Sequence, residues 1–133
     1  MIDDRFKILL EYQNKTSPRK GKGVGDMFVQ WALRNSGHKE RVHQVAITEV
    51  AADQFAEFPA PALEPTFDPP DRKFAAVANA HASKPPIWQA SDCKWMDWHA
   101  DLGACGIKID FLCKSDVCAF YQKKFPGKPV PAI

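Results

Sequence analysis

The order of the expected elements predicts an α/β fold of three layers, with helices on both faces of a short and mostly parallel sheet. Segments with helical spacing alternate along the chain with short runs of strand-forming residues, as they do in parallel α/β sheets. A length of 133 residues suits one domain with a single core. No apolar run approaches the roughly 20 residues that cross a bilayer, so we expect a cytoplasmic protein that makes no membrane contact.

The first third of the chain predicts two helices joined by a basic loop. A helix is expected over about residues 5–14, with Asp3 or Asp4 as its N-cap. Residues 16–25 are expected to form a flexible loop, because they combine a Ser-Pro pair, three spaced glycines and several basic side chains. The next helix, over residues 24–35, is expected to bury Phe28, Trp31 and Ala32.

The middle of the chain predicts short elements and a long irregular crossing. Alternating apolar residues favour a strand over 41–48, and residues 50–58 are expected to form a short helix. Five of the eleven prolines lie within residues 59–70, which we interpret as a crossing loop inside one domain. This part is acidic, since residues 49–72 hold six Asp and Glu side chains against one basic side chain.

The rest of the chain predicts a helix, a strand, a helix, a strand and a last helix. Asp68 at the N-cap and Asp71 in a capping-box position predict a helix that continues to Ala82. A buried strand is expected over 87–91, a helix over 93–104 and an edge strand over 107–111. Ser115 is the expected cap of the final helix, and a loose Pro-rich tail follows it.

Acidic residues are the candidate functional groups. In parallel sheets, ligands bind beyond the carboxyl ends of the strands, where Asp92 is expected to lie. A right-handed crossover from the helix that begins near Asp71 brings that carboxylate to the same place. Two interpretations stay open: these carboxylates are helix caps, or they bind a hard divalent cation that braces a phosphodiester.

The four cysteines favour neither a disulfide scaffold nor a zinc site. All of them lie in the last third of the chain, and a secreted scaffold of this size is usually richer in cysteine. The candidate zinc ligands Cys93, His99, Cys105 and Cys113 lack the paired Cys-x2-Cys spacing of a zinc site. We therefore expect reduced thiols.

Three segments resemble the PIN-domain nuclease superfamily, and within it a branch of small bacterial PIN-like proteins. They are residues 67–78, which read Phe-Asp-Pro-Pro-Asp-Arg-Lys-Phe-Ala-Ala-Val-Ala, residues 90–95 around Asp92, and the strand-forming residues 106–113. Residues 8–12 and 23–31 fit the same pattern. The resemblance implies a PIN-like domain over residues 1–113, followed by a C-terminal helix and Pro-rich tail over 114–133.

The resemblance implies a ribonuclease that uses Mg²⁺ or Mn²⁺ to hydrolyse RNA phosphodiester bonds. One type of such ribonuclease is the toxin of a toxin–antitoxin pair. The acids of the family map onto Glu11, Asp71 and Asp92 as catalytic and metal-binding residues, and onto Asp68 as a further metal ligand or a cap. The basic side chains near the first loop are expected to hold the RNA backbone; they are Lys15, Arg19, Lys20 and Lys22.

The chain departs from the family pattern in two places. The usual N-terminal strand, which is central in the sheet and ends in an Asp, has no counterpart here, and Lys94 stands where a further acid is common. We expect the missing strand to leave unpaired backbone groups between the strands at 42–48 and 87–91. Our interpretation is that the sequence belongs to a longer protein and lacks its first strand. The alternative is that a strand from another segment or another chain fills the gap.

The sequence leaves two main functions open. One is a PIN-like ribonuclease, and the other is a degenerate, catalytically inactive PIN-like domain that binds RNA or a partner protein. A poorly folded fragment is a third interpretation. The partners considered are RNA, an antitoxin-like protein and a second copy of the chain.

Overall fold

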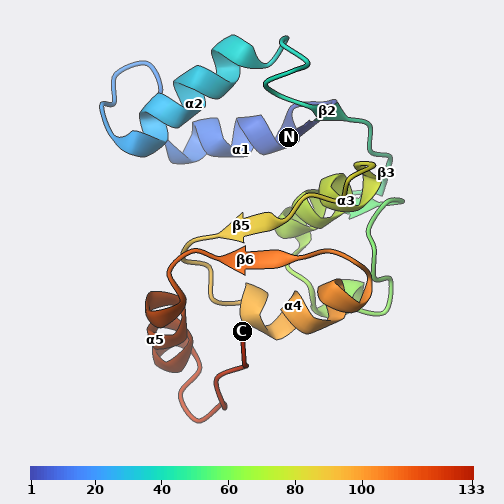
Figure 1. Cartoon of the computed structure of the whole chain (residues 1–133), viewed down its shortest axis with the longest axis vertical. Helices are drawn as coiled ribbons and strands as arrows, with labels where there is room; N and C mark the ends of the chain where they lie inside the picture. Colours follow the sequence, from blue (N-terminus) through green and yellow to red (C-terminus); the bar gives the residue numbers. More distant parts are fainter.

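The computed structural model describes all 133 residues as a mixed α/β chain, which confirms the expected class. In Figure 1, α1 and α2 lie on one side of the molecule, and β5, β6, α4 and α5 lie on the other. No helix combines the length and the apolar character that a bilayer crossing requires. In chain order the elements are β1 (Ile2–Asp3), α1 (Lys7–Lys15), α2 (Val24–Asn35), β2 (Gln44–Val45), β3 (Glu49–Ala51), β4 (Gln54–Phe55), two 3-10 turns (Glu64–Thr66 and Pro69–Asp71), α3 (Arg72–Ala80), β5 (Ile87–Gln89), α4 (Trp95–Ala104), β6 (Ile109–Phe111) and α5 (Lys114–Lys124).

The strands form three separate pairs rather than one sheet. β1 pairs with β2 and β5 pairs with β6, both in parallel, while β3 and β4 form an antiparallel hairpin. Helix α3 contacts both β1 and β5, so it links the two parallel pairs. β1 pairs with one edge of β2, although the sequence predicted no strand at this place. The other edge of β2 has no strand partner, and β5 likewise has a partner on one edge only.

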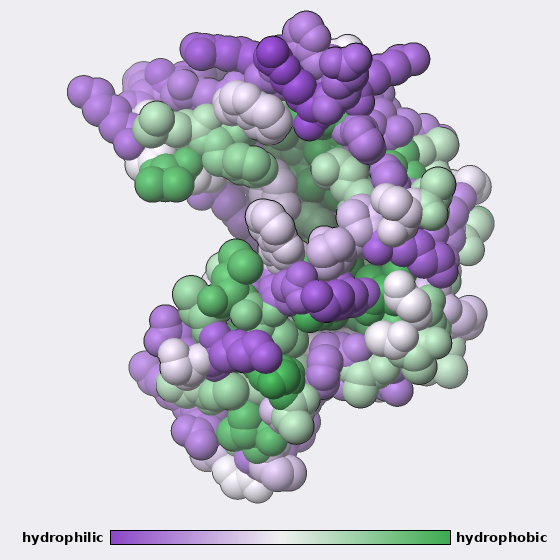
Figure 2. All heavy atoms as spheres, in the orientation of Figure 1, coloured by the Kyte–Doolittle hydropathy of each residue, from purple (hydrophilic) through white to green (hydrophobic).

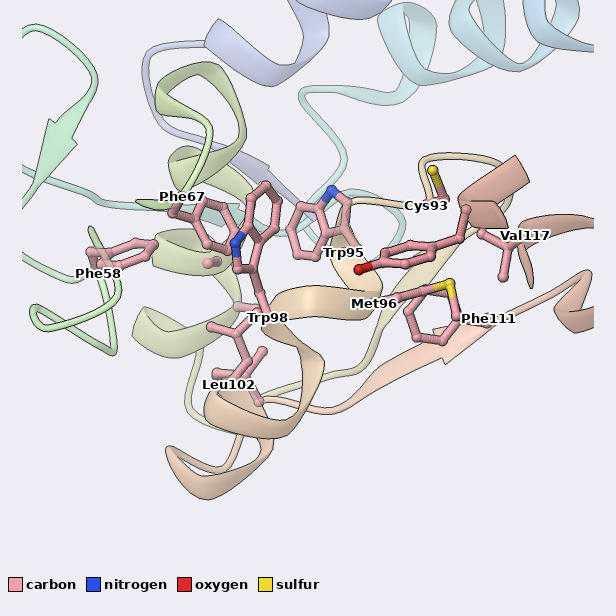
Figure 3. Packing of buried hydrophobic residues seen from close by; sticks show 13 residues of the cluster. Phe58, Phe67, Cys93, Trp95, Met96, Trp98, Leu102, Phe111 and Val117 are labelled. Atoms are coloured by element: carbon pink, nitrogen blue, oxygen red, sulfur yellow. The ribbon is translucent and has the colours of Figure 1, made fainter. Parts of the chain in front are cut away.

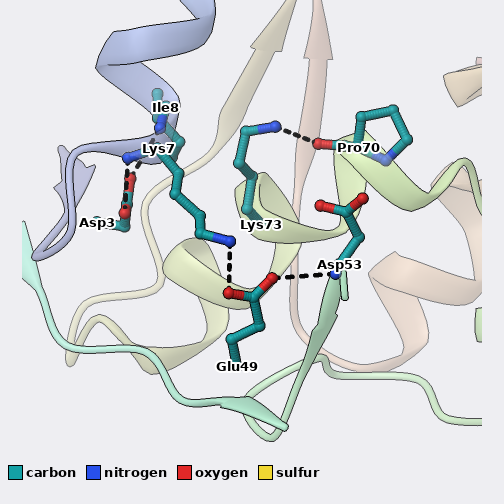
Figure 4. Close-up of polar contacts among 7 residues, drawn as sticks. All are labelled: Asp3, Lys7, Ile8, Glu49, Asp53, Pro70 and Lys73. Carbon is teal, nitrogen blue, oxygen red and sulfur yellow. Dashed lines mark hydrogen bonds and ion pairs between the residues drawn. The ribbon is translucent and has the colours of Figure 1, made fainter. Parts of the chain in front are cut away.

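The N-terminus of α1 is fixed by Asp3, one of the two acids that the sequence offered as its N-cap, although the N-cap position itself is taken by Phe6. This carboxylate is fully buried, and its two oxygens accept hydrogen bonds from the backbone N–H groups of Lys7 and Ile8 at 2.9 and 2.8 Å (Figure 4). The first amides of a helix have no partner within the helix, so a side-chain acceptor stabilises them. A buried acid therefore joins β1 to α1.

A hairpin replaces the short helix that was expected over residues 50–58. Asp53 adopts the left-handed backbone conformation, with φ of 53°, which reverses the chain between β3 and β4. The side chain of Glu49 stabilises this turn, because its Oε1 accepts a hydrogen bond from the backbone N–H of Asp53 at 3.1 Å (Figure 4). The helix prediction was wrong because it did not include this local turn.

The expected capping at the start of α3 is also wrong. Residues 69–71 form a 3-10 turn, and neither Asp68 nor Asp71 makes a capping hydrogen bond. Arg72 instead joins the start of α3 to the segment before this turn, because its guanidinium donates hydrogen bonds to the carbonyl oxygens of Glu64 at 2.7 Å and Phe67 at 3.2 Å. The helix ends at Ala80, before the predicted Ala82. The acids that were expected to cap α3 are thus free for other contacts.

The larger hydrophobic cluster lies between α3, α4, β6 and α5, and we call it the aromatic cluster. Phe67 packs against Trp95 and Trp98, with ring centroids 5.3 and 4.1 Å apart (Figure 3). Two expectations at the C-terminus are corrected here. Ser115 caps nothing, since α5 begins at Lys114 without a side-chain cap, and the tail packs on the cluster through partly buried side chains. The cluster consists of Phe58, Phe67, Ala75, Ala78, Cys93, Trp95, Met96, Trp98, Leu102, Ile107, Phe111, Val117 and Tyr121.

The smaller cluster lies between β1, β2, α1, α2 and α3, and we call it the aliphatic cluster. Its members are Ile2, Ile8, Leu9, Ala32, Val42, Val45, Ile47, Phe55, Ala76 and Val77. Two large side chains that were expected to be buried here are not, since Phe28 is 51% and Trp31 45% exposed. The expectation that β5 is buried is likewise wrong, because Trp88 is 71% exposed. These exposed side chains all face one hollow.

Candidate functional site

A cleft of about 540 Å³ separates the helices α1 and α2 from strand β5. Figure 2 shows this hollow, with apolar side chains gathered on its two sides. The wall on the side of α1 and α2 includes Tyr12, Phe28 and Trp31, and the opposite wall is formed by all three residues of β5. The cleft is therefore lined on two sides by apolar side chains, and the candidate acids described next lie in it.

Three of the predicted acids line this one cleft. Glu11 comes from the middle of α1, Asp71 from the 3-10 turn before α3, and Asp92 from the segment after β5. They reach the same place because α3 packs against both α1 and β5. The structure therefore brings together carboxylates that lie far apart in the sequence.

The pKa of Asp71 is shifted by burial and by neighbouring carboxylates. Burial, and after it the negative charges of Asp92, Asp68 and Glu11, together raise the pKa of its carboxyl group to about 6, against the lowering effect of Lys73. A carboxylate surrounded by other carboxylates resists ionisation unless a cation compensates the charge. This pKa shows that the four acids share one electrostatic environment.

Lysines neutralise two of the four acids. Lys15 Nζ lies 2.6 Å from Oε1 of Glu11, and Lys73 Nζ lies 2.5 Å from Oε2 of the same residue. Burial alone would raise the pKa of Glu11, but the hydrogen bonds from both lysines outweigh it, and the pKa is lowered. Asp68 forms an ion pair with Lys94, which raises the pKa of that lysine.

Asp71 and Asp92 have no ion pair with a lysine or arginine. One oxygen of Asp92 accepts a hydrogen bond from the backbone N–H of Lys94 at 3.1 Å, which orients the side chain. Carboxylates are the donor type that Mg²⁺ and Mn²⁺ prefer. However, no group of three or more His, Cys, Asp or Glu side chains is arranged to hold a metal ion. The donor chemistry fits a hard cation, but the ligand set is incomplete while the lysines hold Glu11 and Asp68.

The predicted RNA-binding residues separate into two places. Lys15 lines the cleft, whereas Arg19, Lys20 and Lys22 are exposed in the loop between α1 and α2. Asp26 closes this loop by accepting hydrogen bonds from the backbone N–H groups of Ser17 and Gly23 at 2.7 and 3.0 Å. The loop is therefore ordered around one carboxylate and presents its basic side chains to solvent beside the cleft.

Sequence reasoning missed two features of the site. Lys73 was part of the helix-start motif, but nothing in its spacing indicated an ion pair with Glu11. The aromatic wall was visible as a pattern, since Phe28 and Trp31 lie three residues apart on one face of α2. That pattern was interpreted as core, because a buried face and a cleft-lining face have the same spacing.

No family model, curated protein or solved structure matches this chain. The interpretation of the cleft therefore depends on the contacts, burial and charges described above.

Proposed function

We propose that the chain is a PIN-like ribonuclease that depends on Mg²⁺ or Mn²⁺, with Asp71 and Asp92 as its principal metal-binding and catalytic carboxylates. The observation that supports it is the convergence of Glu11, Asp71 and Asp92 on one cleft, where the other acids contribute to raising the pKa of Asp71 to about 6. The three-layer PIN-like arrangement belongs to the same proposal. It is supported by two parallel strand pairs bridged by α3.

The residues of the chain have distinct roles in this proposal. A bound divalent ion supplies positive charge at the phosphodiester and lowers the pKa of a water molecule. Asp92 is oriented for this by its contact with the backbone of Lys94. Glu11 and Asp68 would serve as further ligands if Lys15, Lys73 and Lys94 released them, and these lysines would then be available to pair with phosphate oxygens. Arg19, Lys20 and Lys22 hold the RNA backbone beside the cleft.

A second candidate is a degenerate PIN-like domain that binds RNA or a partner protein without catalysis. The observation that favours it is that lysines pair with two of the four predicted metal ligands, Glu11 in the cleft and Asp68 in a separate depression beside Lys94. An antitoxin-like protein or a second copy of the chain are partners that fit this candidate.

RNA cleavage distinguishes the two candidates. We expect a labelled single-stranded RNA to be cut in the presence of Mg²⁺ or Mn²⁺ and to stay intact with EDTA. Asp71→Asn and Asp92→Asn should each lower the rate roughly 10²–10³-fold, because each removes one electrostatic contribution to the reacting phosphate. Asp116→Asn is the matched control, since this acid is exposed on α5 and does not line the cleft.

Two results would contradict the ribonuclease. One is cleavage that EDTA and both cleft variants leave unchanged, which would indicate a contaminating enzyme. The other is the absence of cleavage together with RNA binding that weakens as salt rises and depends on Lys20 and Lys22. That second result selects the binding domain.

A further inference from the structure

Two of the four histidines meet on the surface outside the cleft. His43 directly precedes β2, and His81 directly follows α3. Nδ1 of His43 lies 2.9 Å from Nε2 of His81. His43 is exposed and His81 is half-buried, and neither lines the cleft. The pair is therefore accessible to a ligand and separate from the candidate acids.

The two imidazole rings face each other through these nitrogens. Their planes are inclined by only 8°, and their centroids lie 5.2 Å apart. This separation equals the distance between the two nitrogens plus the radii of the two five-membered rings. The nitrogens thus lie close to the line that joins the ring centres, and the lone pairs of both rings point into the same small space.

Ser83 decides which ring carries the hydrogen between them. Its backbone N–H donates to Nδ1 of His81 at 3.2 Å, and its Oγ lies 2.9 Å from the same atom. Because Nδ1 of His81 accepts here, we assign the hydrogen to Nε2, which donates it to His43. The Oγ of Ser83 can also accept from Nδ1. The ring of His81 can therefore free its Nε2 lone pair and still keep a hydrogen-bond partner on its other side.

Backbone contacts hold both histidines on ordered elements. The N–H of His81 donates to the carbonyl of Val77 at 3.1 Å, and its carbonyl accepts from the N–H of Lys84 at 2.9 Å. The carbonyl of His43 accepts from the N–H of Ile2 at 2.9 Å. The last turn of α3 has no basic side chain, so nothing there compensates the negative end of the helix dipole. The pair is preorganised at a place that favours a cation.

We propose that His43 and His81 bind Cu²⁺ or Ni²⁺ through Nδ1 and Nε2, respectively. Imidazole nitrogen is a preferred ligand of these ions, which favour tetragonal sites with right angles between neighbouring ligands. Bonds from a first-row metal ion to imidazole are about 2.0–2.1 Å long, so two of them at a right angle place their nitrogens roughly 2.9 Å apart. The two nitrogens already have this separation.

Binding changes the direction of the lone pairs and the tautomer of one ring. Both rings turn so that their lone pairs converge on the ion, and the exposure of His43 leaves room for this movement. The hydrogen on Nε2 of His81 is lost to solvent and one is gained on Nδ1, where Ser83 Oγ accepts it, so no net proton is released. A hydrogen bond on the second ring nitrogen is usual for a histidine that binds a metal ion.

Water completes the coordination of the ion, since no third His, Cys, Asp or Glu side chain joins the pair. The bound ion connects the segment before β2 to the end of α3, and both elements contribute to the aliphatic cluster. The proposal is independent of the ribonuclease. It requires neither RNA nor the carboxylates of the cleft, and Mg²⁺ and Mn²⁺ prefer oxygen ligands.

Calorimetric titration of the whole chain with Ni²⁺ alone, and then with Cu²⁺ alone, tests the site. His43→Ala and His81→Ala should each weaken binding at least tenfold. His38→Ala and Cys113→Ser are the controls, because both residues are exposed and could bind the same ions by themselves. Each control should change the affinity less than threefold. Ni²⁺ should also raise the urea midpoint of unfolding of the unaltered chain and of the controls, but not that of the two pair variants.

Nuclear magnetic resonance of the unaltered chain locates the ion even if a variant fails to fold. Cu²⁺ well below one equivalent should broaden the imidazole signals of His43 and His81 before those of His38 and His99.

Four outcomes overturn the proposal. They are no binding of either ion at millimolar concentration, first broadening at another histidine, loss of affinity in only one of the two pair variants, and an equal loss in a control. The last two would show that a single imidazole or a different side chain holds the ion.

Discussion

Helix α4, in the aromatic cluster, and helix α2, beside the aliphatic cluster, bury their tryptophans to different extents. In the aromatic cluster Trp95 and Trp98 are 2% and 6% exposed, because β6, α5 and the tail all pack around α4. On the other side of the cleft, Trp31 is 45% exposed although it lies on a helix of similar length. Burial of a tryptophan in this protein is decided by how many layers cover its helix.

The difference between the clusters follows from the strand pairs. β5 and β6 have α4 and α5 packed against them, whereas the open edge of β5 and the aromatic face of α2 meet only across the cleft. Burying a large aromatic side chain contributes a few kcal/mol to the free energy of unfolding. The exposed aromatic side chains of α2 do not make this contribution in the protein without a ligand. The open side is therefore the part of the molecule where a ligand can add the most apolar contact.

Replacing one tryptophan from each region gives the largest expected contrast. Trp95→Ala should lower the free energy of unfolding by about 3–5 kcal/mol, because it removes a fully packed ring and leaves a cavity beside Phe67. Trp88→Ala is the matched control and should change it by less than about 0.5 kcal/mol, since the ring contacts mainly solvent. Urea unfolding measures both. Equal costs would show that the cleft is closed in solution.

Removing the buried cap of α1 should have the next largest effect. Asp3→Ala leaves two helix amides without acceptors in a buried place, at a cost of about 1–3 kcal/mol. Asp4→Ala is the control, because Asp4 is exposed and makes only a 3.4 Å contact with the N–H of Ile47. Hydrogen exchange of the Asp3 variant should speed up in α1 and stay unchanged in α4. Equal acceleration in both helices would show that the two clusters unfold as one unit.

Local signals predicted the parts of the fold that depend on local chemistry. The bounds of the helix at residues 24–35 are those of α2, because a glycine-rich loop and a Ser-Gly pair mark its ends. Asp3 was one of two candidate caps, with Asp4, because both precede an amphipathic run. The convergence of Asp71 and Asp92 followed from the rule that helix starts and strand ends meet at one edge of a parallel arrangement.

The sequence did not predict what depends on contacts between distant segments. Lys73 and Lys94 lie in the two motifs whose acids were interpreted as metal ligands. The structure shows that these lysines form ion pairs with Glu11 and Asp68. The spacing of Phe28 and Trp31 fits a core helix, and only the absence of a covering layer makes them cleft residues. The expected capping box at Asp71 failed because proline-led 3-10 geometry displaced the start of α3 by one turn.

The smallest predicted effect concerns the boundary between the two regions, where Asp71 stands. Its folded pKa of about 6 lies above the ordinary value of 3.8, so its contribution to stability is complete below pH 3.8 and is lost as pH rises through 6. Asp71→Asn imitates the protonated acid and should stabilise the fold by about 1 kcal/mol at pH 7.5, after allowance for solvent screening. The gain should disappear near pH 4. Urea unfolding between pH 4 and 8 measures it, with Asp116→Asn as the exposed control. A gain that is constant across this range would show that Asp71 is not crowded by the other acids, and it would remove the electrostatic basis for a shared acidic site.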